Sequence, residues 1–245
     1  MTSSPPRDKE NMKSKISQEA EAQAVLVELW GLSDPVKKAG MAGFGITGGQ
    51  VLGIPMELLR KMARRLGCNH ELGLELWASG CFEARLVAAW ICDPARLTRG
   101  QARAWAGDFE NWADCDGVCI HYFRKSLLAH SLAVEFAGEK PEFVKRTGFT
   151  LFATLAVHDK GAEDSVFEGY LAIVERESDD TRNGVKKGVN WALRQIGKRN
   201  ATLRESAIRC AERIRDRGTP AARWIASDAL REFKRIPVRK TPVKK

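Results

Sequence analysis

Four residues of the segment VKKGVNWALRQIGK combine positive charge with a large aromatic ring on one side of a predicted helix. They are Lys187, Trp191, Arg194 and Lys198. Their spacing of i, i+4, i+7 and i+11 places them within about 60° of one another on a helix, opposite an apolar row. Cations neutralise phosphates and an indole offers a flat surface to a base or sugar, so this face is typical of nucleic-acid binding. An amphipathic indole covered by lysine stems would give the same pattern.

A carboxylate with a neighbouring indole occurs in the segment FENWADCDGVC. Trp112 and Asp116 are four residues apart, so a helix would stack them on one face. Asp114 lies about 160° from Asp116 and should point elsewhere, towards the helix start, where acids are favoured. A carboxylate on a phosphate-binding protein is costly unless it has a task. The alternative interpretation is an N-terminal cap, or a salt bridge to a neighbouring repeat through Arg146.

The segments that carry these residues repeat at about 40 residues. Shifting VKKGVNWALRQI back by 41 residues gives VKRTGFTLFATL, in which Val144 corresponds to Val185 and Arg146 to Lys187. We therefore expect Arg146 to project from the equivalent face. Helical self-similarity at this period is typical of HEAT or armadillo units. The predicted fold class is all-α, with HEAT-like helical repeats stacked in a curved solenoid.

Composition favours the same fold. Of 245 residues, 44% are apolar, which suffices for a core, and alternating β-branched residues are nearly absent. Glycine and proline recur at intervals suited to short helices, and we predict ten to twelve. We expect residues 1–20 to be disordered, residues 21–232 to form the repeat domain, and residues 233–245 to form a disordered basic tail.

The net charge of +9 is concentrated towards the C-terminus. Residues 1–180 hold 21 Lys and Arg against 26 Asp and Glu, whereas residues 181–245 hold 19 against 5. The final KRIPVRKTPVKK adds affinity for any polyanion without selecting sequence. An acidic protein or an anionic membrane would also satisfy this charge, although the ordered face around Trp191 favours nucleic acid.

The sequence also bears on compartment and cofactors. It contains no signal-like apolar segment and no run of 18 apolar residues, so we expect a cytoplasmic protein, nucleoid-associated if bacterial. Six cysteines without a CxxC motif favour reduced thiols. Cys115, Cys119 and His121 have no fourth ligand nearby, so we expect neither a metal nor another cofactor. We expect a monomer.

Three motifs in order resemble one enzyme family. NWADCD, VKRTGFTLF and VKKGVNWALRQIGKRN, with MAGFGI from Met41, resemble the AlkD family of DNA alkylation repair glycosylases over about residues 30–230. The family fold is a superhelix of HEAT-like repeats that carries DNA on its concave face. The resemblance implies that Asp116 is the catalytic carboxylate and that Trp112 and Trp191 flank the lesion.

The same resemblance implies further DNA contacts. Arg146 resembles the arginine that contacts a phosphate, and Arg194 assists at the backbone. Phe44 stands where a family member carries Tyr, so a hydroxyl contact is lost there. Gly43 stands where many relatives place Arg, which removes one cation from the groove.

The implied activity is that of a monofunctional glycosylase acting on duplex DNA. It hydrolyses the N-glycosidic bond of cationic purines alkylated at N3 or N7, and the family's route uses no nucleobase pocket. Such a base leaves readily, so the carboxylate needs only to stabilise the oxocarbenium-like sugar. A non-catalytic HEAT scaffold that binds DNA or protein, or an RNA-binding solenoid, would explain the basic face and leave Asp116 without a task.

Overall fold

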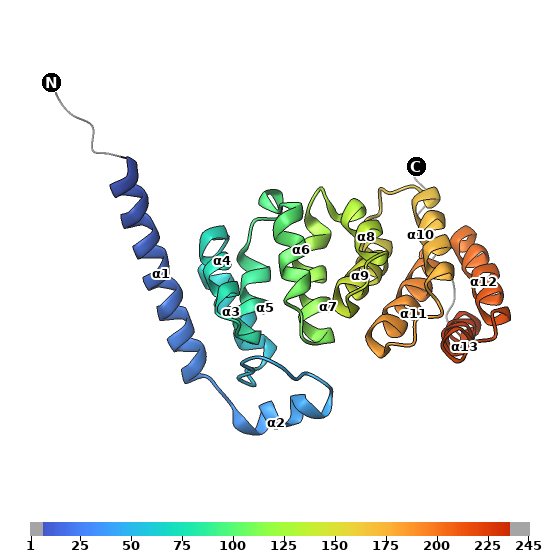
Figure 1. Cartoon of the computed structure of the whole chain (residues 1–245), viewed down its shortest axis with the longest axis horizontal. Helices are drawn as coiled ribbons and strands as arrows, with labels where there is room; N and C mark the ends of the chain where they lie inside the picture. Colours follow the sequence, from blue (N-terminus) through green and yellow to red (C-terminus); the bar gives the residue numbers. More distant parts are fainter. Residues whose placement is uncertain (1–6, 236–245) are drawn as a thin grey trace. The chain divides into compact units, whose positions relative to one another are not determined.

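The computed structural model describes residues 7–235, and side chains from Ile16 onwards, as a set of thirteen α-helices and two short 3-10 turns (Figure 1). Contacts divide the chain into two compact units, residues 1–96 and 97–245. The first unit contains α1 (Arg7–Gly31), α2 (Pro35–Gly43), α3 (Met56–Leu66), α4 (His70–Ala78), α5 (Phe82–Ile91) and the turn Pro94–Arg96. The second contains α6 (Arg99–Gly107), α7 (Trp112–His121), the turn Phe123–Lys125, α8 (Ala129–Ala137), α9 (Glu142–His158), α10 (Asp164–Arg176), α11 (Asn183–Gly197), α12 (Ala201–Asp216) and α13 (Pro220–Arg235).

The all-α prediction is confirmed, since the described residues form no strand beyond one isolated bridge pair, Gln50 with Cys81. At the N-terminus the structure differs from the expectation. Residues 1–20 were expected to be disordered, whereas α1 begins at Arg7. Helix α1 as a whole is rich in Lys, Glu, Gln and Ala, all good helix formers, and that preference outweighs the low hydrophobicity of its first half. The disordered tail was expected from residue 233, whereas α13 continues to Arg235 and buries Phe233. Residues 236–245 lie outside the described residues.

Side-chain caps explain several of the helix starts. Asn69, Thr98, Asn111 and Asn200 each accept a backbone N–H of the first turn through their side chains. Asp34 does the same before Pro35, which occupies the first helical position. These caps satisfy donors that a helix otherwise leaves without partners, so the short helices of the chain begin at defined residues.

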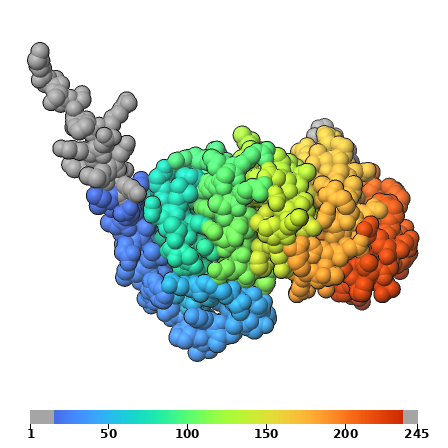
Figure 2. Space-filling view, viewed as in Figure 1, coloured from blue at the N-terminus to red at the C-terminus, as the bar shows by residue number. Residues whose placement is uncertain are grey.

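The repeat of about 40 residues appears in the contacts of the second unit. Arg213 donates to Glu175 and Arg217 donates to Asp179, both across 38 residues, and His130 reaches Tyr170 across 40. These bonds join corresponding helices of successive pairs, which is how a HEAT-like array is stabilised. In Figure 1, α8 with α9, α10 with α11 and α12 with α13 form such pairs. Figure 2 shows the side chains of α10 to α13 (orange to red) as a continuous surface on the face in view.

Close helix packing in the second unit depends on glycine. A Cβ at Gly148 of α9 would lie 2.2 Å from the backbone nitrogen of Ala137 in α8, and one at Gly188 of α11 would lie 3.3 Å from the Phe149 Cβ. α9 therefore approaches both neighbours closely, and twelve of its seventeen residues are buried. None of the described helices is both long and apolar enough to cross a membrane.

Candidate active site

Helix α7 presents the predicted indole and carboxylate. Asn111 caps the helix by accepting the N–H groups of Ala113 and Asp114 at 2.9 and 3.2 Å. Asp114 is buried and accepts from the Asn111 side-chain amide at 3.0 Å, so it belongs to the cap, in agreement with the sequence interpretation. Trp112, the first residue of the helix, is 43% exposed. The cap fixes where α7 begins and therefore where Trp112 and Asp116 lie.

Asp116 is held by two residues of α9. Arg146 donates from Nε to Oδ1 at 3.1 Å and from Nη2 to Oδ2 at 2.8 Å, and Thr150 donates its hydroxyl to Oδ1 at 3.1 Å. A carboxylate has about four acceptor positions, and these bonds occupy three of them. Among contacts of the described residues, the open position lies on Oδ2. The Asp116 side chain is 15% exposed, so the carboxylate is fixed in orientation and still reaches the surface.

Arg146 departs from its predicted placement. The repeat alignment placed it on an outward basic face, whereas its side chain is only 6% exposed. Its third nitrogen, Nη1, donates to the Gly184 carbonyl oxygen at the start of α11 at 2.7 Å. The equivalent residue, Lys187, is exposed. The prediction was wrong because α7 and α11 cover this face of α9, and a shift within the repeat cannot indicate which faces a neighbouring helix covers.

The electrostatics of this pair follow from its burial. Burial on its own lowers the pKa of the Arg146 guanidinium, but the adjacent Asp116 carboxylate outweighs that effect, and the pKa of Arg146 lies above its ordinary value. Arg146 is therefore charged at neutral pH. Removing either partner would leave a buried charge without its counterion.

Trp191 lies on α11, which packs against α9, as α7 does. Val185, Val189, Leu193 and Ile196 are fully buried, as predicted, and Trp191 is half-buried on another side of the helix. The indole N–H lies 3.1 Å from the side-chain oxygen of Gln195 when that amide is oriented to suit its neighbours. This hydrogen bond to a residue one helical turn later fixes the orientation of the Trp191 ring.

The basic face around Trp191 is less open than predicted. Lys187 is exposed, but Arg194 and Lys198 both form ion pairs with Glu232 of α13, and the Lys198 Nζ lies 2.6 Å from its carboxylate. Asp228 lies 3.8 Å from Arg194 as well. A helix added after the basic segment thus neutralises two of its three cations. The helical spacing in the sequence contains no information about this partner.

Phe44 and the clustered cysteines are the remaining residues that the sequence singled out. Phe44 follows α2 in the first unit, and its side chain is 78% exposed. Cys115 and Cys119 are buried, and the Cys115 sulfur lies 3.4 Å from the Thr147 hydroxyl. Across the described residues, no three His, Cys, Asp or Glu side chains are grouped as metal ligands.

Three features escaped the sequence analysis. Thr150 lies one turn after Arg146 and could have been found by that spacing. Trp224 of α13 is an exposed indole with the Lys186 ammonium 5.1 Å from its ring centre, and only the structure brings them together. Glu232 is the third, since nothing in its own segment links it to Arg194.

Comparison with known proteins agrees with this architecture. The model of the DNA alkylation repair enzyme family matches residues 25–233. No curated protein sequence matches the chain significantly. One similar solved structure represents a new family of proteins related to the HEAT-like repeat DNA glycosylases with affinity for branched DNA structures. It superimposes with a TM-score of 0.72 at 20% identity, covering 86% of this chain and 94% of its own. The chain has the HEAT-like repeat fold and belongs to the DNA alkylation repair enzyme family.

Proposed function

We propose that the protein is a monofunctional DNA glycosylase that hydrolyses the glycosidic bond of purines alkylated at N3 or N7 in duplex DNA. The observation that carries the proposal is the Asp116 carboxylate, oriented by Arg146 and Thr150 with one acceptor position open on Oδ2. Such a group stabilises a sugar that develops positive charge and orients the water that attacks it. Trp112 begins the same helix one turn earlier.

The ion pair with Arg146 reduces the rate acceleration that Asp116 is expected to give. A carboxylate 4 Å from the sugar would contribute about 4 kcal/mol at an effective dielectric of 20, but a guanidinium about 4 Å further away opposes this by about 2 kcal/mol. The net attraction of about 2 kcal/mol corresponds to roughly thirtyfold in rate, where an isolated carboxylate would give roughly a thousandfold. Either factor suits a cationic base that already leaves readily. Neither would release an undamaged one.

Arg146 is a positioning residue in this proposal. It holds the carboxylate of Asp116 and ties it to the start of α11, the helix that carries Trp191. The two indoles offer flat surfaces that attract a cationic base or the edge of a sugar. Lys187, Arg194 and Lys198 bind phosphates, the last two after leaving Glu232.

Family membership supports DNA as the partner. The similar structure belongs to proteins with affinity for branched DNA, and this chain carries +14 in residues 181–245. The three residues proposed for the chemistry, Trp112, Asp116 and Trp191, all come from the second unit of one chain, in keeping with a protein that acts as a monomer. A protein with this substrate works where the DNA is, which in a bacterium is the cytoplasm.

The test is release of free base from duplex DNA methylated at purines, under single-turnover conditions with the protein in excess. We expect release of N3- and N7-methylated purines and none from undamaged duplex. Trp112→Leu is a companion variant: its ring is 43% exposed, so release should fall about tenfold while the melting temperature falls only modestly. Absence of release by the wild type on any alkylated duplex would contradict the proposal.

A second candidate is a DNA-binding protein without catalytic activity. The observation that favours it is the bidentate pair, because a carboxylate already neutralised by Arg146 has less effect on a reacting sugar. This candidate predicts retention of branched or duplex DNA on a gel without base release. The two candidates therefore give opposite results in the release assay.

A further inference from the structure

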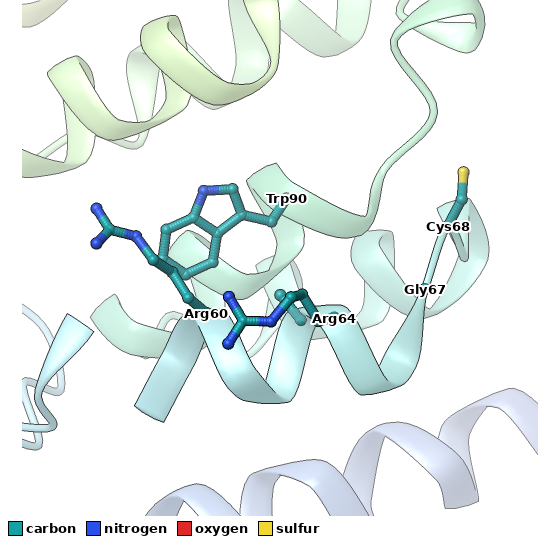
Figure 3. A pocket seen from close by; sticks show the side chains of 6 residues that line it. Arg60, Arg64, Gly67, Cys68 and Trp90 are labelled. Carbon is teal, nitrogen blue, oxygen red and sulfur yellow. The ribbon is translucent and has the colours of Figure 1, made fainter. Parts of the chain in front are cut away.

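A pocket in the first unit contains a combination of side chains that the proposed function does not use. It has a volume of about 350 Å³ and lies between α3 and the end of α5, lined by Arg60, Ala63, Arg64, Gly67, Cys68 and Trp90. In Figure 3, Arg60 and Arg64 extend from one helix towards the indole of Trp90, whereas Cys68 points away from them. Two guanidinium groups and an indole therefore surround one hollow.

Helix α3 forms the basic wall of the pocket. Its eleven residues include Arg60, Lys61, Arg64 and Arg65, against the single acid Glu57. Leu59 and Met62 bury the opposite side, so the cations lie towards solvent. Arg65 forms an ion pair with Glu28, whereas Arg60 and Arg64 form none with the side chains that the structure describes. These two charges are one helical turn apart and are available to an anion.

The spacing of Arg60 and Trp90 suits an inserted planar ring. The Arg60 Cζ lies 6.0 Å from the centre of the Trp90 ring. In a closely packed pair of this kind, Arg199 lies only 4.3 Å from Phe167. A base between two planes needs about 7 Å, twice the contact distance of roughly 3.5 Å between stacked carbons. A movement of Arg60 by about 1 Å would admit one base between guanidinium and indole.

We propose that Arg60, Arg64 and Trp90 form a second DNA-binding site, which takes an unpaired nucleotide. The base stacks on the indole and beneath Arg60, and Arg64 binds an adjacent phosphate. Bases within a duplex are stacked on their neighbours and cannot enter such a hollow, so the site selects single-stranded stretches, flaps or junctions. It makes no use of Asp116 and is independent of the base-release activity proposed above.

Photo-cross-linking identifies the occupant directly. A single-stranded oligonucleotide carrying 5-iodouracil is irradiated with the full-length protein, and the cross-linked peptide is identified by mass spectrometry. We expect a cross-link at Trp90. Cross-links found only at Trp112, Trp191 or other residues would overturn the proposal.

Binding of variants provides a matched comparison. Fluorescence anisotropy should give about tenfold weaker binding of a single-stranded oligonucleotide for Trp90→Leu and for the double change Arg60→Gln with Arg64→Gln. Trp30→Leu, which removes an exposed indole of α1, and Arg65→Gln, which removes a neighbouring cation outside the pocket, should change it less than twofold.

Duplex DNA and base release are the contrasting readouts. The pocket variants should bind a blunt duplex, and release methylated bases from it, within twofold of the wild type. An equal loss for duplex and single strand would show a general basic surface and overturn the proposal, as would losses no larger than those of the two control variants. Tighter binding of the RNA version of the oligonucleotide would overturn the assignment to DNA. A protein that releases no base at all still gives a result in the binding and cross-linking assays.

Discussion

At the scale of residues, the site is an anchored carboxylate. The i, i+4 spacing predicted that Trp112 and Asp116 share one side of α7. The structure adds the cap at Asn111, which fixes where the helix begins. The partner of Asp116 was named only as an alternative to catalysis. Arg146 turns out to hold Asp116 by two hydrogen bonds, and both roles are compatible because one acceptor position stays open. Sequence spacing gives the face of a helix, whereas the neighbouring helix decides what that face contacts.

Trp191→Ala tests whether the half-buried indole contributes more to base release than to the stability of the fold. The variant should lose about 1 to 2 kcal/mol of unfolding free energy, less than the 3 to 5 kcal/mol of a fully buried Trp, and should release alkylated bases at least tenfold more slowly. Urea unfolding and single-turnover release measure the two effects. A stability loss of about 3 kcal/mol or more, with unchanged release, would make Trp191 a core residue.

Glu232→Gln tests whether the paired cations are available to DNA. Removing the carboxylate frees Arg194 and Lys198, so duplex binding should strengthen several-fold and its dependence on salt should become steeper. Titrations at several salt concentrations measure both. Glu205→Gln, an exposed acid of α12, is the charge-matched control. Equal effects of the two changes would indicate that only net charge matters.

Acid should weaken the same contact. Burial alone raises the pKa of Glu232, but Lys198 and Arg194 outweigh that and hold the pKa below its ordinary value. A lowered pKa stabilises the folded protein above the unfolded value of about 4.3, and this contribution disappears as the pH falls through the folded pKa. The difference in unfolding free energy between wild type and Glu232→Gln should therefore shrink from about pH 6 towards about pH 3. A constant difference would contradict the assignment.

At the scale of elements, hydrophobic periodicity predicted most of the helices. The row Val185, Val189, Leu193 and Ile196 is fully buried, and the shift of about 40 residues reappears as hydrogen bonds between successive helix pairs. Low hydrophobicity led us to expect disorder up to residue 20, whereas residues 7–20 lie in α1, in keeping with their helix propensity. The division into two units was not predicted, because the sequence shows no linker near residue 96.

Gly148→Ala tests the close approach of α8 and α9 that positions Arg146. The new Cβ would overlap backbone atoms of Ala137, so we expect a loss of about 2 to 3 kcal/mol or more in unfolding free energy. Gly169→Ala in α10 is the matched control, because its Cβ would meet nothing within 4 Å. That change should be neutral or stabilise by up to about 1 kcal/mol. Similar results for both would contradict the close packing.

At the scale of the whole molecule, the basic C-terminal residues should contribute to DNA affinity and not to the rate of base release. Residues 236–245 carry four Lys and Arg without any acid, and they lie outside the described residues. Deleting them should weaken duplex binding and lower its salt dependence by up to about 0.9 per lost cation. Single-turnover release at saturating protein should hardly change. A large loss in that rate would mean that the tail orders the site.

The central claim is that the Asp116 carboxylate promotes base release. The most direct measurement compares wild type with Asp116→Asn in single-turnover release from methylated duplex at saturating protein. Asn keeps an acceptor for Arg146, and a melting curve verifies that the variant is folded. Glu110→Gln, which removes an exposed acid before the same helix, is the control. Asp116→Asn removes the whole attraction of about 4 kcal/mol and leaves the Arg146 charge in place, so we predict a loss on the order of a hundred to a thousandfold, with DNA binding unchanged or stronger. Equal release by the wild type and a folded Asp116→Asn variant would contradict the account.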